Sequence, residues 1–182
     1  QAVIGMEAAT ARAGQRIESW FEATTTTLTG VAGTRHTRDS IQQLSVILRA
    51  AGTDGPAFLK RTYVDPNTAT GTARDGFDYS ADRSAYGIAH AKVHDVFRRL
   101  RRDHGYYDVF LFDADGNLVY TVTKEADLGQ NAVSGDLSRT PLGAAFRRAF
   151  ADPQTDPRFE DFAPYPYSGG DAASFEHVVY EG

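Results

Sequence analysis

The chain has 182 residues and a formal net charge of −5, from 19 basic and 24 acidic side chains. This length fits one domain with a substantial core. The lack of cysteine excludes disulfides, thiolate metal sites and cysteine nucleophiles, and the acidic balance argues against a general nucleic-acid binder. No window has the roughly 18 uncharged apolar residues that would cross a bilayer. Because the chain begins with Gln1, we expect a piece of a longer product.

Three main helices are predicted in the first 104 residues. Residues 3–31 form a long helix, with an apolar stripe at steps of four and three: Ile17, Phe21, Thr24, Leu28 and Val31. A second helix is predicted over about 37–51, and a short helical piece over 57–63. Residues 65–80 are rich in glycine and small polar residues and predict a long surface loop. The third main helix covers about 84–104 and ends before Gly105.

The second half of the chain is rich in strand signals. Residues 106–112 and 118–123 predict a β-hairpin around a turn at 113–117. Its first strand is apolar on both faces, which is typical of a strand covered on both sides. Thr140 and Pro141 predict a helix start, with the helix over 142–150. Two further strands are predicted over 158–163 and 174–180.

This order of elements predicts an α+β fold, in which a long N-terminal helix and a helical region pack on a PAS-like antiparallel β-sheet. We expect residues 1–104 to form the helical region and residues 105–182 to form the PAS-like lobe. Four strands are one short of that architecture, so we expect the lobe to be truncated before its closing strand.

Two patterns resemble metal sites, but neither is complete. Asp113, Asp115 and Asn117 hold the first, third and fifth places of a calcium loop. The sixth and twelfth places then hold Leu118 and Lys124 instead of glycine and glutamate, so a hairpin turn is the better interpretation.

Histidines and arginines of the third helix also have structural explanations. His90 and His94 are four residues apart, as a metal pair would be, but no third ligand is identifiable, which favours packing. Arg98–Arg102 could meet phosphate or an anionic membrane surface, and a solvated helix end explains them more simply. No nucleophile elbow or glycine-rich phosphate motif is present. We therefore expect no enzyme, no metal and no cofactor.

Asp108 is the most informative polar residue of the predicted hairpin. It shares a strand face with Phe110 and Phe112, so at least partial burial is expected. A buried carboxylate needs a charged partner or several hydrogen bonds. Tyr120 and Lys124 on the second strand could supply them, or the amine of a bound ligand could.

Several short motifs follow the third helix: Gly105–Asp108, Phe110–Asp113, Asp115–Asn117, Val119–Val122, Lys124–Glu125 and Gly129–Asn131. With His94 they form a block that resembles the extracytoplasmic Cache-type, PAS-like sensor of bacterial methyl-accepting chemotaxis proteins. Asp161–Tyr165 and Ser168–Asp171 are similar to the later part of the same pattern.

The resemblance implies a periplasmic ligand-sensing domain of a transmembrane chemoreceptor. It would be tethered to the membrane by flanking helices that this chain lacks, would form a homodimer and would bind a small molecule through Asp108, Tyr120, Lys124 and Tyr165. The tyrosine–arginine–tryptophan signature of amino-acid sensors is absent, since the one tryptophan is Trp20. Alternatives are the sensor of a histidine kinase or cyclase, or a protein-binding or dimerisation module without a small ligand.

Overall fold

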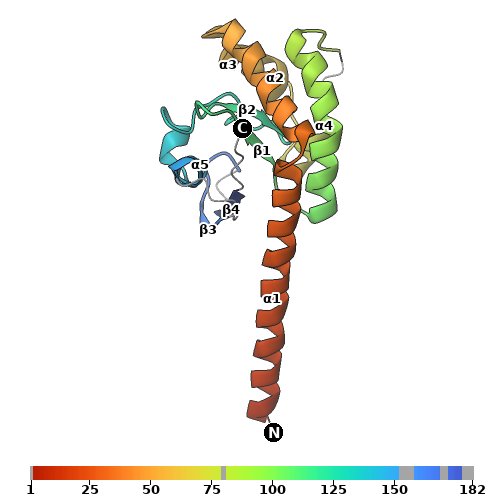
Figure 1. The fold of residues 1–182 in the computed structure, drawn as a ribbon, viewed down its shortest axis with the longest axis vertical. Coiled ribbons are helices and arrows are strands. Elements are labelled where there is room, and N and C mark those ends of the chain that lie inside the picture. Colours follow the sequence, from red (N-terminus) through yellow and green to blue (C-terminus); the bar gives the residue numbers. More distant parts are fainter. Residues whose placement is uncertain (1, 79–80, 152–157, 169–171, 178–182) are drawn as a thin grey trace.

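The computed structural model describes residues 2–78, 81–151, 158–168 and 172–177. The chain has an α+β fold, as the sequence predicts. The helix α1 (Ala2–Ala32) extends away from a body that contains α2 (Arg35–Ala51), α3 (Asp54–Leu59), α4 (Ala85–His104), α5 (Pro141–Ala151) and two pairs of strands (Figure 1). Among the described residues, no helix combines the length and apolarity needed to cross a membrane.

The main helices begin at side-chain caps. The Thr34 hydroxyl accepts a hydrogen bond of 3.2 Å from the Thr37 backbone N–H at the start of α2. The Ser84 hydroxyl accepts one of 3.0 Å from the Gly87 N–H at the start of α4. Such caps satisfy backbone donors that the first turn of a helix leaves free. At its other end α4 stops at Gly105, whose φ of 70° is left-handed.

The segment predicted as a surface loop is partly ordered and partly buried. α3 continues into a π-helical turn, η1 (Lys60–Val64), and a 3-10 helix, η2 (Gly71–Gly76), lies inside the predicted loop. Asn67 and Asp75 are both buried. The prediction of a surface loop therefore holds for residues 71–73 and 76, which are exposed, and is wrong for Asn67 and Asp75; Asp75 is buried because it pairs with arginines of α4.

The β-hairpin forms as predicted, with both strands shorter than the predicted 106–112 and 118–123. β1 (Phe110–Phe112) pairs antiparallel with β2 (Leu118–Thr121), and the turn between them occupies 113–117. The first strand was predicted to begin at residue 106. It begins later because the Asp108 carboxylate accepts the N–H of Thr123 and shares the N–H of Val122 with the Val109 carbonyl, which interrupts the regular ladder.

A second antiparallel pair lies beside the hairpin. β3 (Arg158–Pro164) pairs with β4 (Ala172–His177), and α5 contacts both strands. In the described residues, the four strands thus form two separate two-stranded sheets rather than one platform. Residues 178–180 of the predicted last strand lie outside the described residues.

The hairpin is covered on both sides, as its apolar first strand predicts. On one side Leu111, Val119 and Tyr120 join a core with Leu44 of α2 and Phe97 of α4. On the other side a smaller core faces α5 and is formed by Leu118, Ala132, Leu137, Leu142, Ala145 and Tyr165, with Phe110 and Phe112 against it. The hairpin is therefore the layer between the helical region and the α5 lobe.

Candidate functional site

The four residues that the resemblance singles out fall into two clusters. Tyr120 and Lys124 lie with two histidines of α4, and we call His90, His94, Tyr120 and Lys124 the basic cluster. Asp108 and Tyr165 lie with two other acids, and we call Asp108, Glu125, Asp127 and Tyr165 the acidic cluster. The segment that follows β2 contributes Lys124 to the basic cluster and Glu125 and Asp127 to the acidic cluster.

Lys124 enters the interior because its backbone is left-handed. Its φ is 55°, and it is the one non-glycine residue with a positive φ in the part of the chain that the structure describes. The Thr121 hydroxyl accepts a hydrogen bond of 2.7 Å from the Lys124 N–H and holds this turn. A left-handed conformation costs an ordinary residue about 1 kcal/mol or more. Such strain at a buried lysine marks the position as a functional candidate.

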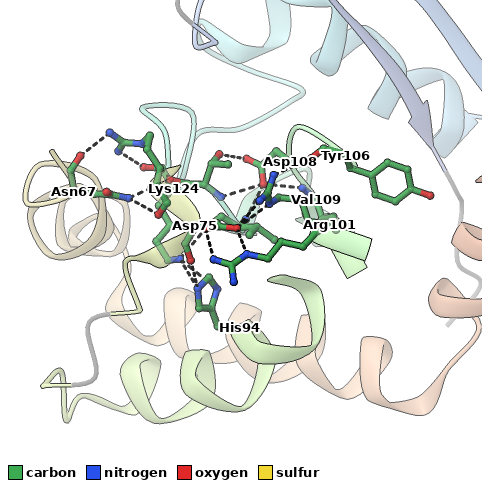
Figure 2. A network of polar contacts seen from close by, with 12 residues as sticks. Asn67, Asp75, His94, Arg101, Tyr106, Asp108, Val109 and Lys124 are labelled. Atoms are coloured by element: carbon green, nitrogen blue, oxygen red, sulfur yellow. Dashed lines mark hydrogen bonds and ion pairs between the residues drawn. The ribbon is translucent and has the colours of Figure 1, made fainter. Parts of the chain in front are cut away.

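The Lys124 amine is completely buried, and the groups within hydrogen-bonding distance of it are uncharged. Its side chain is 0% exposed. Nζ donates to the carbonyl oxygen of Val122 at 3.0 Å and lies 3.3 Å from both ring nitrogens of His94 (Figure 2). No carboxylate among the described residues forms an ion pair with Lys124. Burial consequently lowers the pKa of Lys124 to about 7.

His94 links the lysine to β2 and to η2. Its Nε2 lies 3.0 Å from the carbonyl oxygen of Asp75, which can only accept, so Nε2 carries the proton. Nδ1 is then the acceptor for the Tyr120 hydroxyl, at 2.8 Å. Burial, and after it the charge of Lys124, lowers the pKa of His94 to about 4, which keeps this ring neutral.

His90 is the unsatisfied member of the basic cluster. Its ring is 1% exposed, and neither nitrogen has a hydrogen-bond partner among the described residues. It stacks on His94, with ring centroids 4.8 Å apart, and lies the same distance from the ring of Tyr63. Burial, and after it Lys124, lowers the pKa of His90 to about 2. Native proteins rarely leave such groups unpaired, because each costs about 1–3 kcal/mol.

The short helix η2 covers the basic cluster and is fixed to α4 by an ionic contact. The Asp75 carboxylate accepts from Arg101 at 2.5 Å and from Arg102 at 2.8 Å. The hydrogen bond from Arg102, more than any other interaction, lowers the pKa of Asp75 to about 2. The arginine cluster was interpreted as a solvated face, which is wrong for Arg101, because this side chain is buried against Asp75.

Arg74 joins η2 to the end of the hairpin. Its guanidinium donates to five backbone carbonyls: those of Val64, Asn67, Ala69, Thr123 and Lys124. The shortest of these contacts, to Lys124 and to Asn67, are both 2.6 Å. The position of η2 over the basic cluster is therefore set from two sides, by α4 and by the residues after β2.

The acidic cluster lies on the other side of that segment. The Asp108 carboxylate accepts from the backbone N–H groups of Val109, Val122 and Thr123 and from the Thr123 hydroxyl. The predicted partners Tyr120 and Lys124 donate no hydrogen bond to it, so that prediction is wrong. Burial raises the pKa of Asp108 despite these donors.

Two further carboxylates of the acidic cluster keep one free oxygen each. Tyr165 donates to Asp127 Oδ2 at 2.5 Å, and Tyr107 donates to Glu125 Oε1 at 2.7 Å. Asp127 Oδ1 and Glu125 Oε2 are buried without a partner among the described residues. Burial raises the pKa of Asp127 to about 7, so this carboxyl holds its proton more tightly than an exposed aspartate.

A cavity of about 310 Å³ opens elsewhere, between α2, α3 and the hairpin turn. Arg49, Asp113 and Asn117 are among its lining residues, and none of the four residues named from the resemblance lines it. Asp113 accepts from Asn117 at 3.0 Å, as expected for a hairpin turn. Across the described residues, no group of three histidine or acidic side chains could hold a metal ion.

Sequence reasoning identified the pair His90 and His94 but assigned it to packing alone, and it missed Asp75 and Arg74. An aspartate and an arginine in a loop rich in small polar residues give no local signal of burial. Comparison of the chain with protein-family models, with curated proteins and with solved structures finds no match.

Proposed function

We propose that this chain is a periplasmic ligand-sensing domain of a transmembrane chemoreceptor, held at the membrane by flanking helices, and that its ligand binds at the basic cluster. The observation that carries the proposal is the combination of a strained, fully buried Lys124 with a buried His90 that has no hydrogen-bond partner in the part of the chain that the structure describes. A cluster that served stability alone would pair these groups or replace them with apolar ones. No catalytic role is proposed for any residue.

The arrangement of helices offers a route for the signal. α4 carries His90 and His94 and contacts α2, which in turn contacts α1. The corner between α1 and α2 is stiff, because Thr34 and Thr37 both donate their hydroxyls to the Val31 carbonyl, at 2.8 and 2.7 Å. A ligand that favours one position of α4 would therefore move α1 (Figure 1). Helix shifts of about 1–2 Å are common in such switches.

Some of these observations also support two other functions. The input domain of a histidine kinase or cyclase would use the same site and the same outgoing helix. A protein-binding or dimerisation module is favoured by the exposed side chains of Ile17 and Trp20 on α1. We propose that the receptor is a homodimer, and sedimentation of the purified chain with Trp20→Ser as the comparison tests this.

The ligand-binding proposal is tested by thermal unfolding against a library of small metabolites. A ligand at 100 times its dissociation constant adds about 2.7 kcal/mol to the free energy of unfolding. We expect at least one compound to raise the midpoint of the wild-type chain and of Lys92→Met, an exposed control on α4. Lys124→Met should lose that effect. A library without a single stabilising compound would favour the protein-binding alternative.

A further inference from the structure

We propose that residues 124–127 form a proton-operated switch, in which Lys124 is buried against α4 when its amine is neutral and Asp127 is buried beside Tyr165 when its carboxyl is protonated. The two ends of the segment then respond to pH in opposite directions. The inference concerns the local structure after β2 and does not depend on the proposed ligand. It follows from how the segment is held, from the groups at its two ends and from the sign of each titration.

The backbone of the segment is fixed on both sides. At its start the Thr121 hydroxyl accepts from the Lys124 N–H at 2.7 Å, and Arg74 donates to the Lys124 carbonyl at 2.6 Å. Beyond its end the Gly129 N–H donates to the Leu118 carbonyl of β2 at 3.0 Å. Because these bonds hold the main chain, each side chain can leave its own cluster without the other.

The amine end lies in the basic cluster, which supplies no anion. Lys124 Nζ donates to the Val122 carbonyl and lies near His94 (Figure 2), and no carboxylate in the described part of the chain forms an ion pair with it. Burial lowers the pKa of Lys124 to about 7. It lowers the pKa of His90 to about 2 and that of His94 to about 4, and raises that of Tyr120 well above 10. Between pH 6 and pH 8, Lys124 is therefore the member of this cluster that changes its charge.

The carboxyl end lies among like charges. Asp127 Oδ2 accepts from the Tyr165 hydroxyl at 2.5 Å, and Oδ1 is buried with no partner among the described residues. Burial, and after it the charge of Asp108, raises the pKa of Asp127 to about 7, and Glu125 acts in the same direction. Burial of this side chain therefore favours the protonated form, although the hydrogen bond from Tyr165 opposes this.

The two titrations have opposite signs. Below pH 7 Lys124 is charged, which disfavours its burial, whereas Asp127 is neutral and is buried more easily. As the pH rises through 7, the lysine loses its charge and the aspartate gains one. Between pH 6 and pH 8, the ratio of open to closed forms should fall about tenfold at the Lys124 end and rise about tenfold at the Asp127 end. Protons thus shift the preferred attachment of the segment between α4 and the α5 lobe.

Asp108 acts on both ends of the segment. It raises the pKa of Lys124, because it favours the ammonium form, and it raises the pKa of Asp127, because it opposes a second negative charge. The other ionisable groups that act on one end or the other, or on Glu125, are His90, His94 and Arg98 of α4, Arg74 and Asp75 of η2, Asp78, Tyr107, Tyr120 and Tyr165. Removal of Asp108 should therefore lower both pKa values together.

The test measures hydrogen exchange of the folded chain at pH 6 and pH 8, corrected for the intrinsic pH dependence of exchange. Peptides that cover 71–76 and 90–97 report on the basic cluster, and peptides that cover 158–165 report on the acidic cluster. From pH 6 to pH 8 we expect opening to fall about tenfold at the first two and to rise about tenfold at the third.

Matched variants separate the two ends. Lys124→Met should lose the pH response at 71–76 and 90–97 and keep that at 158–165, and Asp127→Asn should do the reverse. Lys92→Met and Asp103→Asn, which replace exposed residues of α4, should behave as wild type. The inference is overturned if both regions respond in the same direction, or if a response persists in the variant that lacks its titrating group.

A titration of the wild-type chain alone makes the test independent of how the variants fold. Carbon-13 NMR of the lysine Cε and the aspartate carboxyl carbons follows the two protonation steps directly. We expect Lys124 and Asp127 both to titrate near pH 7. A Lys124 that titrates near 10.5, or an Asp127 that titrates near 3.8, would refute the switch.

Discussion

Lys124→Met should stabilise the protein at pH 6, although it removes a side chain with several hydrogen bonds. Burial lowers the Lys124 pKa from 10.5 to about 7. At 1.36 kcal/mol per pKa unit, this difference corresponds to about 5 kcal/mol of unfavourable free energy when the amine is charged in both states. The variant leaves the Val122 carbonyl unpaired, which costs about 1–3 kcal/mol. The net gain should be about 3 kcal/mol. Methionine keeps the left-handed backbone, so strain does not enter the comparison.

The sign of the pH dependence gives a second check. Because the pKa of Lys124 is lower in the folded state, the buried amine destabilises the fold most at low pH, where it is charged. This unfavourable free energy disappears as the pH rises from 7 to 10.5. Urea unfolding at pH 6, 8 and 10 should therefore show the advantage of Lys124→Met shrinking steadily. With a urea dependence of about 2 kcal/mol per molar, the shift in midpoint at pH 6 is about 1.5 M. A variant less stable than wild type at pH 6, or a difference independent of pH, would refute the reasoning. Lys92→Met should change stability by less than about 0.5 kcal/mol.

Three further predictions concern neighbouring groups. The pKa of His90 is lowered to about 2, so the unfolded chain binds a proton below pH 6.5 that the folded chain does not, and the free energy of unfolding falls as the pH falls. In urea titrations, His90→Phe should reduce the slope of this fall between pH 6 and pH 4 by about 1.4 kcal/mol per pH unit. The pKa of Asp127 is raised to about 7, so the stability that its protonated carboxyl provides is complete below pH 3.8 and is lost as the pH rises through 7. Asp127→Asn should therefore become more stable relative to wild type across that pH range. A difference in the free energy of unfolding that stays constant with pH would contradict the burial of this carboxyl. Thr140→Ala removes the cap to Gly143 at the start of α5 and should cost about 1 kcal/mol, against no change for Thr53→Ala, an exposed threonine at the start of α3 that makes no capping hydrogen bond.

Much of the fold could be predicted because it is encoded locally. The stepwise apolar stripe of α1, the cap at Thr140 and the turn around Asp113 each depend on neighbours in the sequence. The start of β1 could not be predicted, because strand-forming residues precede it and only the tertiary position of Asp108 ends the ladder. Alternation of side chains in the predicted hairpin places Lys124 on the face of Tyr120. It gives no indication of the left-handed turn that brings the amine to His94, since a positive φ is not a preference of lysine.

The candidate site was predicted in part. The resemblance drew attention to Tyr120 and Lys124, which share a cluster, and to Asp108 and Tyr165, which lie in another. Nothing in the local sequence connects His94 with Asp75, because this contact joins α4 to a loop through a backbone oxygen. Contacts of this kind depend on chain geometry rather than on residue type, so only the folded chain reveals them.

Arg74 shows that the segment over the basic cluster, which Asp75 already joins to α4, is also held through main-chain atoms alone. Among the described residues, every acceptor of its guanidinium is a main-chain oxygen, from η1 and the residues after it and from the end of the hairpin. The residues that supply those oxygens can therefore be exchanged freely in evolution, provided that the backbone path and the one arginine remain. The inward-facing side chains could thus change without rebuilding the structure that closes over them.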